Sequence, residues 1–161
     1  MKEFEEQIPV VKGHWKIEIY KGDKQTTEYL EQIIEGDNLV VTLGKHILLD
    51  RLFGLGGVAA LTHMGVGTDS TAAAVEQTKL NPTVAGSVDF NAFDSTPTRS
   101  SQTVTCVATW GTADGNFSWN ELGLANSATN DGTHLFNRIV IGPFSKTSAV
   151  SIVVTVTITQ S

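Results

Sequence analysis

Hydrophobic and polar residues alternate with a period of two in three segments of this chain. In residues 13–20, one tryptophan and two isoleucines alternate with charged or polar neighbours. Residues 102–110 and 150–159 show the same pattern, with threonine at many of the polar positions. A period of two is typical of a strand with one buried face, and threonine suits the solvent side of a sheet. The pattern therefore predicts a β-strand in each segment.

Further short strands are predicted between clusters of Gly, Asn, Asp, Ser and Thr. Residues 26–34 follow a polar turn and are expected to pair with the first strand as a hairpin. The other predicted strands cover residues 60–66, 84–93, 117–125 and 134–141. Short strands without helices long enough for parallel crossovers indicate a mainly β fold, an antiparallel β-sandwich of jelly-roll-like architecture.

One α-helix is predicted in the N-terminal half, within residues 38–54. Its apolar residues fall in pairs four positions apart, which would place them along one helical stripe. These pairs are Leu43 and Ile47, Leu48 and Leu52, and Leu49 and Phe53. Asn38 or Thr42 could cap the helix, and Gly44 favours the later start. Residues 67–81 could add one helical turn or remain a loop.

The composition fits one folded domain. The chain has 161 residues, of which 40% are hydrophobic and 17% charged, enough for a core and too little charge for a disordered chain. Its net charge of −6 would repel a polyanion, so we expect no nucleic-acid partner. No apolar run approaches the ~18 residues of a membrane span, and the first residues lack the pattern of a secretory signal. We therefore expect no membrane partner and synthesis in a cytoplasm.

Histidine and cysteine give no sign of a reactive centre. The four histidines, at positions 14, 46, 63 and 134, lack the HxH or HExxH spacing of metal sites. The single cysteine, Cys106, alternates with apolar neighbours, which predicts that it fills the core rather than acts as a nucleophile. We expect no metal, no cofactor and no catalytic cysteine.

Three carboxylates near turns are the remaining candidates for chemistry. Glu121, Asp114 and Asp131 could form an acid–base pair or bind calcium, although the spacing of a calcium loop is missing. Capping of turns is the favoured role of Asp114 and Asp131. The glycines within residues 64–67 are interpreted as a turn after a strand, because the third glycine of a dinucleotide loop is absent. No nucleophile, base and orienting group occur at credible spacing, so an enzyme is not expected.

Four segments occur in an order that resembles a group of tailed-bacteriophage virion structural proteins. They are NLVVTLGKHILLDRLFG (38–54), MGVGTDSTAAAVEQTKL (64–80), TVTCVATWGTADGNFSWNELGLAN (103–126) and GTHLFNRIVIGPFSKTSAVSIVVTVTITQS (132–161). The resemblance covers about residues 12–161. It implies a protein that is made in the host cytoplasm and built into the virion. Its implied partners are the major capsid protein or another virion protein and further copies of itself, with a trimer as one natural form.

Members of this group occupy several positions on the particle. The favoured function is a capsid decoration or cement protein that stabilises the head by binding across capsomers. A tail, neck or fibre-associated structural protein is the alternative, and copy number per particle would separate the two. A carbohydrate-binding receptor module is the third possibility. It would need exposed aromatic residues among Trp110, Trp119, Phe117 and Phe144.

The first residues form the predicted partner-binding segment. We divide the chain into an N-terminal arm, residues 1–12, and a single β-sandwich domain, residues 13–161. Phe4, Ile8, Val10 and Val11 have no element to join in the sequence pattern, so they are the predicted contacts to a neighbour. A frayed terminus is the alternative interpretation.

Overall fold

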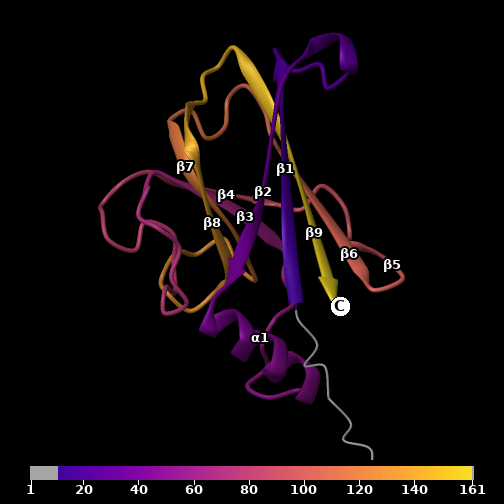
Figure 1. The fold of residues 1–161 in the computed structure, drawn as a ribbon, viewed down its shortest axis with the longest axis vertical. Coiled ribbons are helices and arrows are strands. Elements are labelled where there is room, and N and C mark those ends of the chain that lie inside the picture. Colours follow the sequence, from indigo (N-terminus) through magenta and orange to yellow (C-terminus); the bar gives the residue numbers. More distant parts are fainter. Residues whose placement is uncertain (1–10, 161) are drawn as a thin grey trace, which may run out of the picture.

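The strands of this protein form one antiparallel sheet (Figure 1). The structure is a computed structural model that describes residues 11–160. Its strands are β1 (Val11–Lys21), β2 (Leu30–Val40), β3 (His63–Gly67), β4 (Val88–Ala92), β5 (Thr98–Ser100), β6 (Thr103–Trp110), β7 (Ser118–Ala125), β8 (Leu135–Ser145) and β9 (Val150–Gln160). A 3-10 turn, η1 (Thr27–Tyr29), precedes β2, and the helix α1 (Thr42–Phe53) follows it. The order across the sheet is β4-β3-β7-β8-β2-β1-β9-β6-β5.

The three strands predicted from strict alternation are neighbours in the sheet. β9 pairs with β1 over eleven residues, from Val11 opposite Gln160 to Lys21 opposite Val150, and with β6 on its other side. Their inward side chains are buried, whereas the intervening threonines are more exposed. The alternation therefore identified both the strands and the side of the sheet that faces the core. β1 begins at Val11, so Val11 and Lys12 belong to the sheet and not to the predicted arm.

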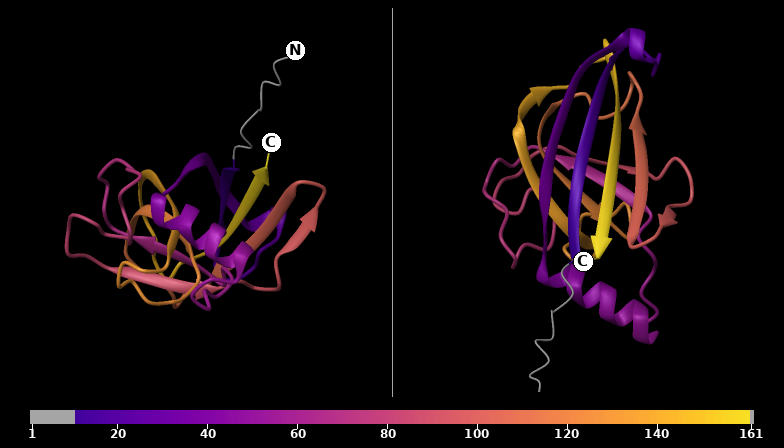
Figure 2. Two further views of the ribbon diagram at one scale, coloured as in Figure 1. Left: turned by 90° about the horizontal axis from the view of Figure 1, so that it is seen from below. Right: turned by 45° about the vertical axis from the view of Figure 1, so that its right-hand side comes forward.

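The sheet curls until its two halves face each other (Figures 1 and 2). Side chains from β1, β6 and β9 pack in one core with side chains from β3, β7 and β8, including the fully buried Trp15, Trp110 and Trp119. β2 joins the halves, because it pairs with β1 along most of its length but with β8 only at Leu39 and Val40. The mainly β class with one N-terminal-half α-helix is confirmed. The two separate sheets of a jelly-roll-like sandwich are not confirmed, since the strands are continuous in one curled sheet.

The helix α1 starts at Thr42, which agrees with the later start, but its N-cap is Val41, so the predicted capping by Asn38 or Thr42 was wrong. It ends at Gly54, whose φ of 66° is left-handed and therefore suits glycine. The prediction of one shared apolar stripe was wrong. Ile47 and Gly44 are buried on the inward side, whereas Leu48, Leu49, Leu52 and Phe53 are exposed on other sides of the helix. No helix in residues 11–160 is long and apolar enough to cross a membrane.

A long segment, residues 68–87, covers the outer face of β3, β7 and β8. It contains no helical turn, so the loop alternative is confirmed there. Leu80 from this segment is fully buried in a small second cluster with Val41 and Leu135. The glycines of residues 64–67 lie inside β3 and do not form a turn, which corrects their predicted role. A Cβ on Gly65 would come within 2.4 Å of Phe90 Cε1 and 2.7 Å of Leu80 Cδ1, so a larger residue at this position would have to displace these two side chains.

Candidate functional site

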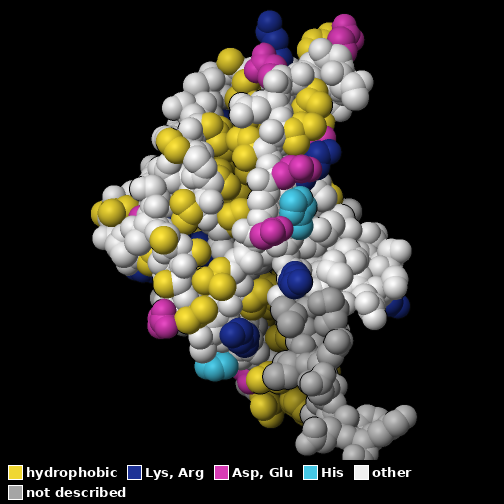
Figure 3. Space-filling view, viewed as in Figure 1, with side chains coloured by type: hydrophobic (Ala, Val, Ile, Leu, Met, Phe, Trp, Pro, Cys, Tyr) yellow, Lys and Arg dark blue, Asp and Glu magenta, His cyan; other side chains and the backbone are white. Residues whose placement is uncertain are grey.

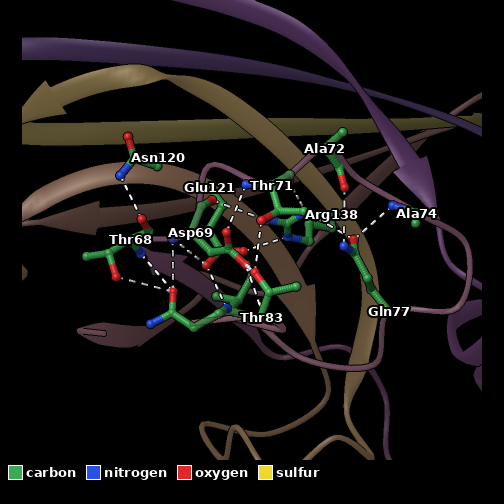
Figure 4. A network of polar contacts seen from close by, with 12 residues as sticks. Thr68, Asp69, Thr71, Ala72, Ala74, Gln77, Thr83, Asn120, Glu121 and Arg138 are labelled. Carbon is green, nitrogen blue, oxygen red and sulfur yellow. Dashed lines mark hydrogen bonds and ion pairs between the residues drawn. The ribbon is translucent and has the colours of Figure 1, made fainter. Parts of the chain in front are cut away.

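Two charged residues are buried on the outer face of the sheet, beneath residues 68–87 (Figure 4). Glu121 from β7 and Arg138 from β8 are fully buried, and Arg138 Nε donates to Glu121 Oε2 over 2.5 Å. Removing two charges from water costs several kcal/mol for each ion, which their attraction offsets only when the remaining hydrogen-bonding positions are also filled. The partners of these remaining positions therefore decide what the pair can do.

The covering segment fills those positions with its backbone. Glu121 Oε1 accepts hydrogen bonds from the N–H groups of Asn81 (2.7 Å) and Asp69 (3.2 Å). Arg138 Nη1 donates to the carbonyl of Thr71 and to the amide oxygen of Gln77, and Nη2 donates to the carbonyl of Asp69. Burial raises the pKa of the Glu121 carboxyl above its ordinary value, although the hydrogen bond from Arg138 opposes this shift.

Asp69 and Asn81 shape the segment around the ion pair. Asp69 accepts hydrogen bonds from the N–H of Thr71 and from both the N–H and the hydroxyl of Thr83. Burial alone would raise the pKa of Asp69, but these hydrogen bonds outweigh it and lower the pKa to about 2. Asn81 has a left-handed φ of 49°, and its side-chain oxygen accepts hydrogen bonds from the N–H groups of Thr68 and Asp69. This geometry fixes the segment in one path over the sheet.

The network has no polar atom left over for a substrate. Within the described residues, both oxygens of Glu121, both oxygens of Asp69 and all three nitrogens of the Arg138 guanidinium have a protein partner. A reactive centre needs a group that is free to bind or to exchange a proton with a ligand. The arrangement therefore supports a scaffold role for this network.

A second buried cation, Lys146, forms hydrogen bonds that connect neighbouring parts of the chain. Lys146, the residue after β8, donates to the carbonyls of Gly111 (2.7 Å) and Val150 (3.2 Å) and to the side-chain oxygen of Asn116 (3.1 Å). Burial lowers the pKa of its ammonium group, although carboxylates such as Asp114 act in the opposite direction. The three acceptors match the three donors of the ammonium group, so Lys146 also serves the scaffold.

The structure does not bring the predicted carboxylates together. Glu121 is enclosed in its ion pair, whereas Asp114 accepts a hydrogen bond from the N–H of Gly111, and Asp131 accepts two from Thr133. Turn capping by Asp114 and Asp131 is thus confirmed. Within residues 11–160, no group of three or more His, Cys, Asp or Glu side chains is placed to hold a metal ion.

Most of the other residues that the sequence singled out as candidates for chemistry or binding are buried. Cys106 lies in the core, and burial raises the pKa of its thiol to about 11, which confirms its predicted core position. Trp110 and Trp119 are also fully buried, and their indole N–H groups donate to Asp89 and to the carbonyl of Gly115. These two tryptophans therefore offer no stacking surface to a sugar. Phe117 and Phe144 are partly buried against the same core.

Several large apolar side chains of α1 and its C-terminal end are exposed. We define the α1 face as Leu48, Leu49, Leu52 and Phe53, together with Leu55 beyond the helix end. Leu52 and Phe53 are 73% and 70% exposed. Hydrophobic side chains reach the surface at this end of the molecule in the space-filling view (Figure 3). Sequence reasoning missed this surface because leucine on both sides of a helix gives no contrast between the side that packs on the sheet and the side that does not.

A groove of about 1000 Å³ continues from the α1 face to the start of β1. Its apolar lining includes Leu48, Leu49, Val40, Phe136 and Val11. The predicted partner-binding residues Phe4, Ile8 and Val10 lie outside the described residues, but Val11 is in the wall of this groove. The arm therefore joins the domain beside the α1 face.

No family model, curated protein or solved structure matches the chain. The functional proposal therefore rests on the sequence pattern, the exposed α1 face and the satisfied polar networks.

Proposed function

We propose that this protein is a structural component of a tailed-bacteriophage virion, most specifically a capsid decoration or cement protein that binds across capsomers. The observation that carries the proposal is the α1 face, where five large apolar side chains are exposed together. A contiguous apolar surface of this kind marks a protein-interaction site more often than a solvent-facing surface. The order of the sequence segments, which resembles phage virion proteins, supplies the class of partner.

The two buried cation sites support a role without catalysis. The groups around Arg138 and Lys146 are engaged with one another and with backbone carbonyls, so they stabilise loops rather than face a ligand. The facing halves of the curled sheet are compatible with the sandwich architecture that we propose for such shell proteins. We accordingly propose a binding protein and not an enzyme, with the major capsid protein and further copies of this chain as partners.

The mechanism is thermodynamic. A protein that binds the assembled shell but not its separated subunits stabilises the shell by mass action, and many copies multiply a modest contact. In this proposal, the arm contacts the neighbouring capsid subunit through Phe4, Ile8 and Val10. The arm continues into β1 at Val11, and β1 pairs with β2 on one side and with β9 on the other. Force on the arm is thereby distributed over the centre of the sheet.

Particles that lack this protein would test the proposal. Purified full-length chain added to such particles is expected to bind and to raise the temperature at which they release DNA. A chain without residues 1–10 keeps the described sheet and is expected to restore less of this stability. Failure of the full-length chain to bind, or to change the release temperature, would contradict a cement role.

A tail, neck or fibre position is the second candidate. The α1 face favours it equally, because apolar surfaces also join subunits in rings and trimers at a single vertex of the particle. The copy number per particle separates this candidate from a decoration protein.

A further inference from the structure

The strands β2 and β8 diverge from the two residue pairs that join them (Figures 1 and 2). Within residues 11–160, β2 pairs with β8 only at Leu39 and Val40, although it pairs with β1 along most of its length. Residues 30–38 of β2 therefore have no strand partner on the side away from β1. Residues 139–145 of β8 lie beside β7 and likewise have no strand partner on the side of β2. We call the opening between these two free edges the β2–β8 wedge.

Core side chains lie along both strands of the β2–β8 wedge. Ile34 of β2 is partly buried, and Ile139 and Ile141 of β8 are each 7% exposed, and all three pack in the main core. Hydrophobic side chains reach the surface between the two strands in the space-filling view (Figure 3). A further strand placed here would remove these apolar atoms from water, which is favourable.

A groove of about 540 Å³ lies at the narrow end of the β2–β8 wedge. Its lining includes Leu39 from β2, Ile139 and Val140 from β8, and Ala72 from the covering segment. Asn38 also lines it, and both polar atoms of the Asn38 side chain are buried without a hydrogen-bond partner in the part of the chain that the structure describes. Buried polar atoms are nearly always paired, and a peptide backbone offers both a donor and an acceptor. The groove therefore fits a peptide.

The charges beside the β2–β8 wedge favour a cationic peptide. Glu31 and Glu35 are exposed on the outer side of β2, because they alternate with the inward Ile34. Residues 139–145 of β8 carry no charged side chain. The cation opposite Glu35 in β1 is Lys16, and its ammonium group donates to Glu18. The excess of negative charge would attract Lys or Arg side chains of a partner.

We propose that the free edge of β2 binds an extended segment of another protein, with apolar residues at every second position and Lys or Arg among the others. Its backbone pairs with residues 30–38 of β2, as in other cases of strand addition to a sheet edge. Its apolar side chains cover the isoleucines of the β2–β8 wedge, and its cations face Glu31 and Glu35. β2 provides the main edge, because Pro143 lacks a backbone donor in β8.

The arm of this chain, or of a second copy, has the wrong charge for the site. Residues 1–10 contain three glutamates and one lysine, so they would be repelled by the glutamates of β2. The site is also separate from the α1 face. The inference therefore goes beyond the proposed function and does not depend on it.

Calorimetric titration of the full-length chain with two synthetic peptides tests the site. The first peptide, KVTVKVTVK with blocked ends, alternates valine with lysine or threonine, and the second has glutamate in place of each lysine. The lysine peptide is expected to bind at least about tenfold more tightly than the glutamate peptide. Equal affinities for the two peptides, or no binding of the lysine peptide at millimolar concentration, would overturn the proposal.

A charge reversal on β2 tests the contribution of the glutamates. Glu35→Lys is expected to weaken binding of the lysine peptide by about threefold. Glu76→Lys is the matched control, because Glu76 is also exposed but lies in the covering segment. Both substitutions are at the surface, and thermal unfolding checks that both variants fold like the wild-type chain. The same loss of affinity in both variants would contradict recognition at β2.

Amide hydrogen exchange locates the bound peptide. The lysine peptide is expected to slow exchange in residues 30–38 of β2 and to leave α1 unchanged. Slower exchange in α1 alone would overturn the proposal. A synthetic peptide of residues 1–10 that binds more tightly than the lysine peptide would also overturn it, by showing that the arm covers this edge. None of these measurements uses phage particles, so the DNA-release experiment can fail while this site is confirmed.

Discussion

The ion pair between Glu121 and Arg138 matters because each partner would be costly without the other. Replacing Arg138 with methionine would leave the Glu121 carboxylate buried without its counter-ion and would release the hydrogen bonds to Thr71 and Gln77. We expect Arg138→Met to lower the free energy of unfolding by about 3–5 kcal/mol, measured by urea denaturation. Lys16, which pairs with Glu18 at the surface, supplies the control, and Lys16→Met should have a much smaller effect. Similar losses in the two variants would contradict a stabilising role for the buried pair.

Asp69 should give stability a dependence on pH. Its pKa of about 2 in the folded state lies below its ordinary value of 3.8, so the folded chain releases this proton more readily than the unfolded chain. The resulting stability is present above pH 4 and is lost as the pH falls through about 2. The raised pKa of Glu121 acts in the opposite direction, because protonation of Glu121 at low pH favours the folded state.

Comparison with Asp69→Asn isolates this effect, because both proteins retain Glu121. The free energy of unfolding of the wild-type chain, measured in urea between pH 5 and 2, is expected to fall more steeply than that of the variant. Parallel curves for the two proteins would show that the hydrogen bonds from Thr71 and Thr83 do not depend on the charge of Asp69.

At the scale of elements, replacing a glycine of α1 with alanine is expected to destabilise the protein, although alanine usually stabilises a helix relative to glycine. Alanine is favoured over glycine in a helix by about 1 kcal/mol. However, a Cβ on Gly44 would lie 1.9 Å from the carbonyl oxygen of Phe136 in β8. We therefore expect Gly44→Ala to destabilise the fold by about 1–3 kcal/mol in thermal or urea unfolding. At Gly142, nothing lies within 4 Å of the corresponding Cβ, so alanine there should be tolerated, and equal effects at both positions would contradict close packing of α1 on β8.

The elements that the sequence predicts well are those with a strong local pattern. β1, β6 and β9 alternate strictly and were found close to their predicted bounds. The short β5 was missed, because three exposed residues carry no hydrophobic signal. The curling of the sheet was not predicted either. It depends on the short pairing of β2 with β8 at Leu39 and Val40, which no local pattern encodes.

The buried network escaped sequence analysis for a similar reason. Glu121 and Arg138 meet because β7 pairs with β8 in a register with an irregularity between Trp119 and Glu121. This irregularity allows Trp119 to face the core while Glu121 faces the covering segment. The available signal was the presence of a glutamate and an arginine inside otherwise apolar strands, but it could not identify their partners at Asp69 and Asn81.

At the scale of the whole molecule, the described residues that stabilise the fold differ from those that offer an exposed apolar surface. The polar networks and the three-tryptophan core hold the curled sheet, whereas the exposed apolar surface gathers on α1 and beside the start of β1. A structural virion protein needs this combination, because it must keep its shape while its surface joins neighbours. The resemblance to phage proteins and the α1 face therefore lead to the same proposal.

Quantitative mass spectrometry of purified phage particles tests the central claim most directly. The number of copies of this chain is measured against the known number of major capsid subunits in the same particles. A decoration protein is expected at hundreds of copies per particle, and about a dozen or fewer would instead place the chain in the neck, tail or fibre. Absence of the chain from purified particles would contradict a structural role in the virion.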